Sequence, residues 1–108
     1  MSRSKPHDEA MADLYRKDPA FALQLLNDVL ANGKQRELLV TLRQMTLAFG
    51  GVRTVAAAAG LNPTQLYRTL SPGGNPSLST LTAVLGVMGL RVAVQPVMRT
   101  RRPRARIR

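Results

Sequence analysis

Residues 52–70 read VRTVAAAAGLNPTQLYRTL and predict two short helices joined by a tight turn. The first helix is rich in alanine, and Gly60 follows it, because glycine tolerates the positive φ that ends many helices. Asn62 then suits an N-cap, Pro63 suits the first helical position, and Gln65 stands third, close to a capping box. The second helix is expected to end near residue 70.

The spacing within this stretch predicts a helix–turn–helix unit rather than two unrelated helices. Such a unit needs a small residue where the second helix crosses the first, and apolar residues where the pair packs on the core. Ala56 lies four residues before Gly60, and Leu66 lies six residues after it. The remaining residues of the inner face are expected to be Val52, Val55, Ala59 and Leu61. An ordinary αα-hairpin is the alternative, since it also favours alanine and glycine.

The second helix would expose four polar or aromatic side chains, Thr64, Gln65, Tyr67 and Arg68. In a helix–turn–helix unit this helix enters the major groove of DNA by its N-terminal end. Arginine can read guanine, glutamine can read adenine, and threonine can bond a phosphate or contact a thymine methyl group. The side chains therefore suit a surface that reads duplex DNA.

The distribution of charge supports a polyanionic partner for the later part of the chain. The 108 residues include 16 Lys and Arg against six Asp and Glu. All six acids lie in residues 1–37, where six bases balance them, whereas residues 38–108 hold ten arginines and no acid. An acid-free basic segment favours nucleic acid. The alternative is that the surplus arginine only keeps the protein in solution.

Four further helices can be predicted from caps and apolar spacing. The first begins at His7 or Asp8 and ends near residue 17; the second runs from Asp18-Pro19 to Asn32-Gly33. The third spans about 34–49, and the last begins at a Ser77 cap and closes at residue 89. Core-facing residues recur every three or four positions. They are Met11, Leu14, Tyr15, Ala22, Leu25, Leu26, Val29, Leu30, Leu38, Leu39, Leu42, Met45, Phe49, Leu78, Leu81, Val84, Leu85 and Met88.

One strand is predicted after the last helix, because apolar and other residues alternate until Pro96. Its residues are Leu90, Arg91, Val92, Ala93, Val94 and Gln95. A lone strand cannot satisfy its own backbone groups, so the simplest arrangement pairs it with a second copy across a twofold axis. Packing against its own helices, or pairing with a strand of another protein, are the alternatives. The Gly- and Pro-rich loop at 71–76 is expected to be a connector, with a phosphate contact as the alternative.

The expected fold is all-α in one domain, apart from this strand. Residues 7–37 would form N-terminal helices packed on the core, residues 38–96 the DNA-binding part, and residues 97–108 a basic disordered tail. With no cysteine and one histidine, His7, the usual metal and nucleophile–base sites cannot be built, and Asp8, Glu9 and Asp13 fit a solvated helix face. We expect no catalysis, cofactor, metal or membrane span, and a cytoplasmic protein.

The chain resembles the addiction module antidote family over residues 7–96, outside the arginine tail. The most specific part of the likeness is Leu66-Tyr67-Arg68-Thr69-Leu70-Ser71 followed by Gly74-Asn75-Pro76. The resemblance implies a lambda-repressor-like helix–turn–helix of the XRE type, in a homodimeric antitoxin. It further implies that the protein represses its own operon and neutralises a RelE/ParE-type toxin. By position, Thr64, Gln65, Tyr67 and Arg68 match the recognition helix, and Arg53 matches a phosphate contact.

Two other functions remain open from the residues alone. The first is a stand-alone helix–turn–helix transcriptional regulator with no toxin partner. The second is a protein that coats nucleic acid without sequence preference, through its arginine tail.

Overall fold

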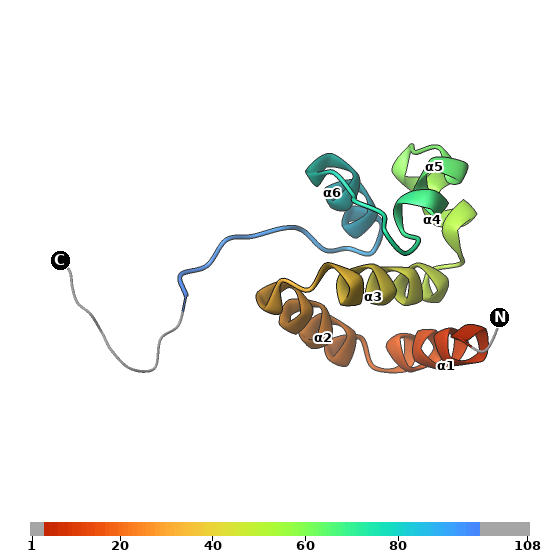
Figure 1. The fold of residues 1–108 in the computed structure, drawn as a ribbon. Coiled ribbons are helices and arrows are strands. Elements are labelled where there is room, and N and C mark those ends of the chain that lie inside the picture. The colour runs from red at the N-terminus through yellow and green to blue at the C-terminus, as the bar shows by residue number, and fades with distance from the viewer. Residues whose placement is uncertain (1–3, 98–108) are drawn as a thin grey trace, which may run out of the picture.

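The computed structural model describes residues 4–97, and that part of the chain folds into six helices (Figure 1). Their bounds are α1 Ser4–Lys17, α2 Pro19–Asn32, α3 Gln35–Ala48, α4 Val52–Ala59, α5 Pro63–Thr69 and α6 Leu78–Val87. The helical fold predicted from the sequence is confirmed. The first helix begins earlier than predicted, at Ser4 instead of residue 7 or 8.

The helix ends follow the capping residues that the sequence offers. The Asp18 carboxylate accepts a hydrogen bond from the backbone N–H of Phe21 at 3.1 Å and so closes the start of α2. Gly33, at φ 70°, ends α2 by donating its N–H to the carbonyl groups of Val29 and Leu30. The Ser77 hydroxyl accepts from the N–H of Thr80 at 3.1 Å at the start of α6.

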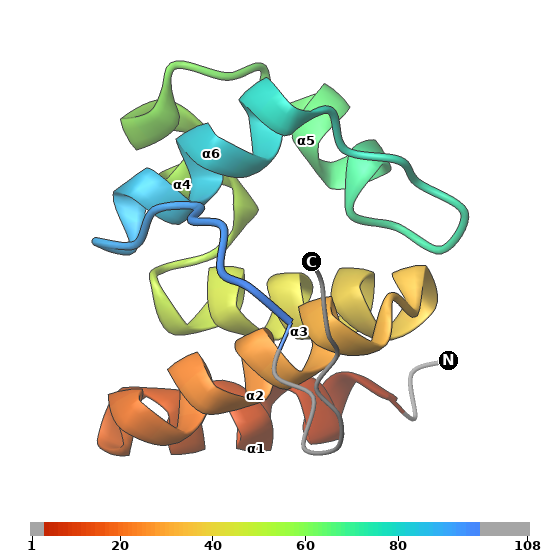
Figure 2. The same ribbon diagram turned by 90° about the vertical axis from the view of Figure 1, so that its left-hand side faces the viewer.

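Helix α3 lies between two groups of helices. Helices α1 and α2 pack on one side of it, and α4, α5 and α6 occupy the other side, as both views show (Figure 1, Figure 2). Helix α4 contacts α3, α5 and α6, so it joins the second group to the rest of the molecule. We call α1–α3 the long-helix half and α4–α6 the short-helix half.

A single hydrophobic core runs through both halves and includes most of the predicted residues. Its buried members are Tyr15, Ala22, Leu26, Leu39, Leu42, Met45, Val55, Ala56, Leu66, Leu70, Val84, Leu85 and Met88. Four predicted core residues are instead exposed: Leu14 by 39%, Leu30 by 43%, Phe49 by 44% and Leu78 by 67%. Those predictions were wrong. Leu30, Phe49 and Leu78 lie at helix ends, and Leu14 lies beside rather than on the face of α1 that contacts α3.

Three polar side chains of α3, Thr41, Gln44 and Thr46, are buried, which the apolar pattern did not predict. The Tyr15 hydroxyl donates to Gln44 Oε1 at 2.9 Å, and Gln44 Nε2 donates to Asp8 Oδ1 at 3.0 Å. Burial, and after it the negative charge of Asp8, raises the pKa of the Tyr15 hydroxyl. This chain of hydrogen bonds ties α1 to α3 from within.

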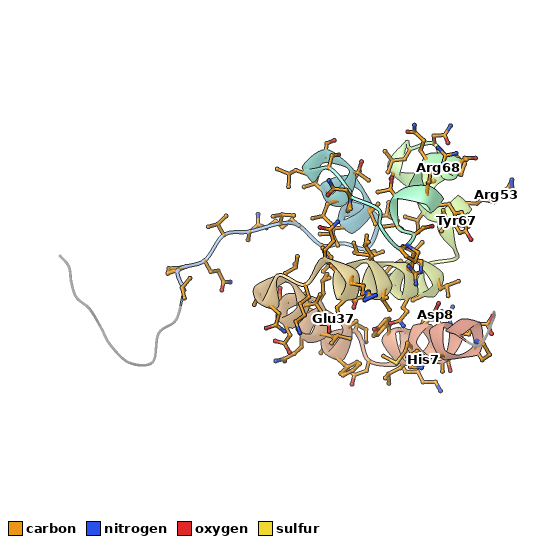
Figure 3. All side chains as sticks on the ribbon, in the orientation of Figure 1. His7, Asp8, Glu37, Arg53, Tyr67 and Arg68 are labelled. Carbon is orange, nitrogen blue, oxygen red and sulfur yellow. The ribbon has the colours of Figure 1, made fainter. Side chains whose placement is uncertain are left out.

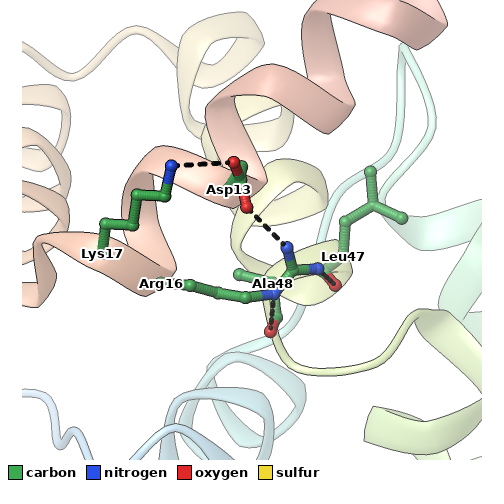
Figure 4. Close-up of polar contacts among 5 residues, drawn as sticks. All are labelled: Asp13, Arg16, Lys17, Leu47 and Ala48. Atoms are coloured by element: carbon green, nitrogen blue, oxygen red, sulfur yellow. Dashed lines mark hydrogen bonds and ion pairs between the residues drawn. The ribbon is translucent and has the colours of Figure 1, made fainter.

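Arg16 ties the same two helices together at the surface (Figure 4). Its Nε donates to the carbonyl of Ala48 at 3.0 Å and its Nη2 to the carbonyl of Leu47 at 3.1 Å. These carbonyls belong to the last turn of α3, where intrahelical partners run out. Asp13 lies 3.5 Å from Arg16 Nη1 and 3.4 Å from Lys17 Nζ. The guanidinium group therefore closes the end of α3 just before the chain turns into α4.

The predicted strand at Leu90–Gln95 is absent from the single chain. Residues 90–97 have no regular secondary structure there, and Figure 1 shows the segment leading away from the helices. The physical reason is that a strand is defined by pairing, and no second strand is present in the described residues. Apart from residue 97, the predicted basic tail lies outside those residues. Within residues 4–97, no helix is long and apolar enough to cross a membrane.

Candidate nucleic-acid interface

The turn between α4 and α5 is built on one alanine and one glycine. Ala56 is fully buried, as is Val55 beside it. Gly60, at φ 71°, donates its N–H back to α4, and the N–H of Leu61 reaches the Ala56 carbonyl at 2.8 Å. This six-to-one hydrogen bond across a left-handed residue is a Schellman motif. It reverses the chain sharply enough for α5 to pack against α4.

Helix α5 is capped at its start and anchored along one face. The Asn62 side chain accepts from the N–H of Gln65 at 2.9 Å, as its position before Pro63 predicts. Leu66 is 2% exposed and Leu70, just after the helix, is 1% exposed. Because these leucines are four residues apart, they share one face and hold the opposite face outward.

The outward face of α5 carries all four side chains that the sequence singled out. Thr64, Gln65 and Arg68 are exposed, and Tyr67 is 62% exposed. Thr64 and Arg68 are four residues apart and Gln65 and Arg68 three apart, so these three side chains are neighbours on the helix surface. Figure 3 shows Arg68 and Tyr67 on α5 at the end of the molecule distant from α1.

Arg53 lies on the neighbouring helix, one residue after the start of α4. Its side chain is exposed and points away from the body of the molecule (Figure 3). Gly51 precedes α4 and supplies no side-chain cap, so the first N–H groups of this helix have no capping side chain as acceptor. A cation beside such N–H groups is a suitable place for a phosphate oxygen.

The end of α5 is fastened by a residue whose role the sequence did not reveal. Arg43 of α3 donates its Nη1 to the carbonyl of Leu70 at 2.8 Å. The Ser71 hydroxyl donates to the carbonyl of Tyr67 at 2.7 Å. In the sequence Arg43 contributes only a positive charge to an acid-free segment, and nothing in its neighbours predicts a bond 27 residues away.

The loop at 71–76 returns the chain to α6 across a close approach of backbones. Gly74 donates its N–H to Ser71 at 2.8 Å and accepts from Gln35 Nε2 at 2.6 Å. A Cβ at Gly74 would collide with the Thr69 carbonyl group. These contacts hold the loop as a connector requires. Between α5 and the loop lies an open concavity of about 490 Å³ whose lining includes Gln65, Arg68 and Asn75.

Acidic residues are confined to one of the two halves of the described part of the molecule, the long-helix half. Every acid of the chain belongs to residues 1–37, in α1, at the Asp18 N-cap of α2, in α2 and in the first turn of α3. In Figure 3, Asp8 and Glu37 lie in the long-helix half, whereas Arg53 and Arg68 lie on α4 and α5. The surface around α5 therefore has no carboxylate of its own half to repel a polyanion.

The described residues contain no group of three His, Cys, Asp or Glu side chains that could hold a metal ion. His7 is exposed near the start of α1, and Asp8 is hydrogen-bonded to Gln44. The carboxylates that the sequence placed on a solvated face are therefore partly used to join helices. Within residues 4–97 the exposed polar groups of α5 are the candidate for ligand recognition.

Comparison with known proteins assigns most of the chain to a family model. A family model described as "Probable addiction module antidote protein" matches residues 8–96, which include all six helices except the first turn of α1. No curated protein and no solved structure matches the chain.

Proposed function

Because the chain belongs to the family of probable addiction module antidote proteins, we propose that it is an antitoxin that also reads DNA. In this proposal a homodimer binds an operator in its own promoter and represses the operon. The same protein neutralises a toxin of the RelE/ParE type encoded beside it. Recognition of base edges would fall to Thr64, Gln65, Tyr67 and Arg68, and Arg53 would contact a phosphate.

The observation that carries the DNA-binding part is the presentation of α5. The helix is held from behind by Leu66 and Leu70, and its opposite face exposes side chains that can pair with bases. Arg43 and Ser71 fasten the end of this helix, so its outward face is held in place by contacts within the protein. Binding of DNA then costs the protein little conformational entropy.

The geometry of duplex DNA and the extended segment after α6 support the dimer in this proposal. Two recognition helices related by a twofold axis would read half-sites about 34 Å apart. Residues 90–95 keep the alternation of a strand and are exposed beyond residue 90, so pairing with a second copy would satisfy their backbone groups. In the proposal this ribbon joins the two protomers.

The toxin would meet the long-helix half, on the surface turned away from α5. Helices α1 and α2 complete the core by packing on α3, and they also expose apolar side chains such as Phe21 and Leu30. A toxin bound there would leave α5 accessible to DNA. One protein could in this way hold toxin and operator together.

The experiment that tests the DNA-binding proposal compares two arginine variants on the promoter of the chain's own operon. Arg68→Ala should weaken specific binding by about 1–3 kcal/mol, because one base-reading side chain is lost. Arg36→Ala is the matched control: Arg36 is also exposed but lies on α3 in the long-helix half. Quantitative footprinting with a scrambled competitor measures both. Equal affinity for wild type and Arg68→Ala would overturn the assignment of α5.

Two further measurements separate the other functions. Removal of residues 97–108 should make the salt dependence shallower and keep operator preference; loss of nearly all binding would instead indicate a non-specific coating protein. Co-purification with the product of the neighbouring gene tests the toxin. A protein that binds its operator and captures no neighbouring product would be a stand-alone regulator.

A further inference from the structure

An apolar groove lies on the side of the molecule where the long-helix and short-helix halves meet. It has a volume of about 270 Å³ and is lined by the end of α1, the start of α2, the end of α3 and the residues around Met88. Nearly all of its lining is apolar, with Arg16 the exception. Leu23 and Phe49, both in this lining, are each 44% exposed. Apolar side chains left open in a groove indicate a binding surface.

A second unpartnered apolar surface begins at the rim of the same groove. We call residues 90–97 the arm. Its first residue, Leu90, lines the groove and is held by a hydrogen bond from its N–H to the Leu85 carbonyl at 2.8 Å. The arm then exposes three valines: Val92 by 43%, Val94 by 95% and Val97 by 79%.

Resting on the homodimer of the proposed function, we propose that each arm crosses to the second copy and places its valines in that copy's groove. Pairing the arms antiparallel brings the end of one arm to the root of the other. The root is Leu90, which is also the rim of the groove. The pairing that satisfies the backbone therefore delivers Val94 and Val97 to the apolar surface that lacks a cover.

The arm's own groove is a poorer destination for these valines. Figure 1 shows the arm leading away from the helices, so it would have to reverse its direction to return. Residues 91–95 read RVAVQ and contain no glycine, asparagine or aspartate, the residues that favour a tight reversal. A second copy receives the arm without such a turn.

The combined surface supplies most of the residues that a standard interface uses. The arm and the groove lining together comprise seventeen different residues of each protomer. A standard interface uses about 20–30 residues on each side. The exchange is reciprocal, since a twofold axis buries both arms and both grooves at once. The occupant of the groove is thus the arm of a second copy.

Cross-linking of single-cysteine variants tests the exchange directly, because the natural chain has no cysteine. Leu23→Cys and Val94→Cys are prepared as separate proteins of different mass, mixed to exchange subunits, and treated with a short bismaleimide. A product joining one chain of each kind is expected. Leu30→Cys replaces Leu23→Cys as the control, because Leu30 is the same residue type on the same helix, 43% exposed, and outside the groove lining.

The other products identify the other occupants. Val94→Cys chains linked only to each other would mean that the arms pair without entering the grooves, which overturns the exchange and leaves the dimer intact. A link that forms only within one chain carrying both substitutions would mean that the arm folds back on itself. In a third outcome no cross-link forms, and a co-expressed toxin protects the cysteine of Leu23→Cys from maleimide. This would place the toxin in the groove and would also overturn the proposal.

A charge in the groove supplies the second readout. Leu23→Asp should weaken the dimer about 10- to 100-fold in sedimentation equilibrium, because a leucine that the partner's arm would cover is replaced by an ionised group. Leu30→Asp should leave the dimer unchanged. Circular dichroism of both variants confirms that they fold. A wild-type dimer insensitive to Leu23→Asp overturns the exchange, whereas a wild-type monomer that still reads the operator overturns the proposed homodimer itself.

Discussion

The two halves of the molecule reach stability by different means. Each helix of the long-helix half has 14 residues, and side-chain hydrogen bonds such as those of Tyr15 and Arg16 join them to one another. The helices of the short-helix half have eight, seven and ten residues, too few to be stable alone. They depend on caps at Gly60, Asn62 and Ser77 and on close packing.

This difference bears on what each half can present to a partner. In the short-helix half the polar side chains of α5 are not needed to hold the fold, so they stay exposed on an anchored helix. In the long-helix half, some charged side chains are already used in hydrogen bonds between helices, as Asp8 and Arg16 show. We infer that a polyanion binds the exposed face of α5 in the short-helix half, and that a protein partner binds the long-helix half.

The largest expected effect comes from removing Leu66, the buried leucine that anchors α5. Leu66→Ala should lower the free energy of unfolding by about 2–5 kcal/mol, because Leu66 is 2% exposed and a cavity would remain. Its neighbour Tyr67 is 62% exposed, so Tyr67→Ala should change stability by about 0.5 kcal/mol or less. Urea denaturation measures both. Similar losses for the two variants would contradict the division between the anchored and the outward face.

The loop between α5 and α6 offers the next test. Gly74→Ala should destabilise the protein by about 1–3 kcal/mol, because the new Cβ meets the backbone carbonyl of Thr69, which cannot rotate away. Gly86→Ala, inside α6 with nothing within 4 Å, should instead stabilise by about 0.5–1 kcal/mol. Thermal unfolding of the two variants gives the sign of each effect. A neutral Gly74→Ala would mean that the loop is not fastened as described.

Helix positions could be predicted from the sequence because each end is marked by a residue with its own chemistry. Asp18, Asn62 and Ser77 begin helices by accepting a backbone N–H, and Gly33 and Gly60 end them at positive φ. The four candidate side chains of α5 could be placed for the same reason. Once the helix starts at Pro63 and Leu66 faces inward, the period of the helix turns the others outward.

What could not be predicted depends on contacts between distant segments. The burial of Gln44 follows from Tyr15 and Asp8, which lie 29 and 36 residues away. Arg43 fastens Leu70, although its charge alone suggested an external partner. The strand at 90–95 needs a second strand, which residues 4–97 of a single copy do not provide. A periodic pattern predicts which residues share a face of a helix or strand, but it does not predict which other segment packs against that face.

The buried hydrogen-bond chain of the long-helix half gives a smaller and pH-dependent effect. Tyr15→Phe should destabilise by about 1–2 kcal/mol, because Gln44 Oε1 then lacks its buried donor. In the natural protein, the raised pKa of Tyr15 leaves stability intact below about pH 10 and lowers it above that, as the unfolded chain ionises first. Denaturation between pH 8 and about 11 should show a weaker alkaline loss in Tyr15→Phe.

The smallest predicted effect concerns the two bonds by which Arg16 closes the end of α3, just before α4 begins. Arg16→Ala should cost about 1 kcal/mol, since two charge-assisted bonds to Ala48 and Leu47 are lost but the side chain is half exposed and screened. Arg36→Ala, an exposed arginine of the same half, should cost less than about 0.5 kcal/mol.

A second variant, Asp13→Asn, separates the bonds of Arg16 to α3 from its ion pair with Asp13. Asp13→Asn removes the carboxylate and keeps both bonds to α3, so it should leave stability nearly unchanged at any ionic strength. Hydrogen exchange at Phe49 and Gly51, which donate to the last turn of α3, should quicken in Arg16→Ala and stay slow in Asp13→Asn. Equal exchange in both variants would mean that the end of α3 holds without the guanidinium group. Arg16 of α1 would then not stabilise the turn that leads from α3 into α4.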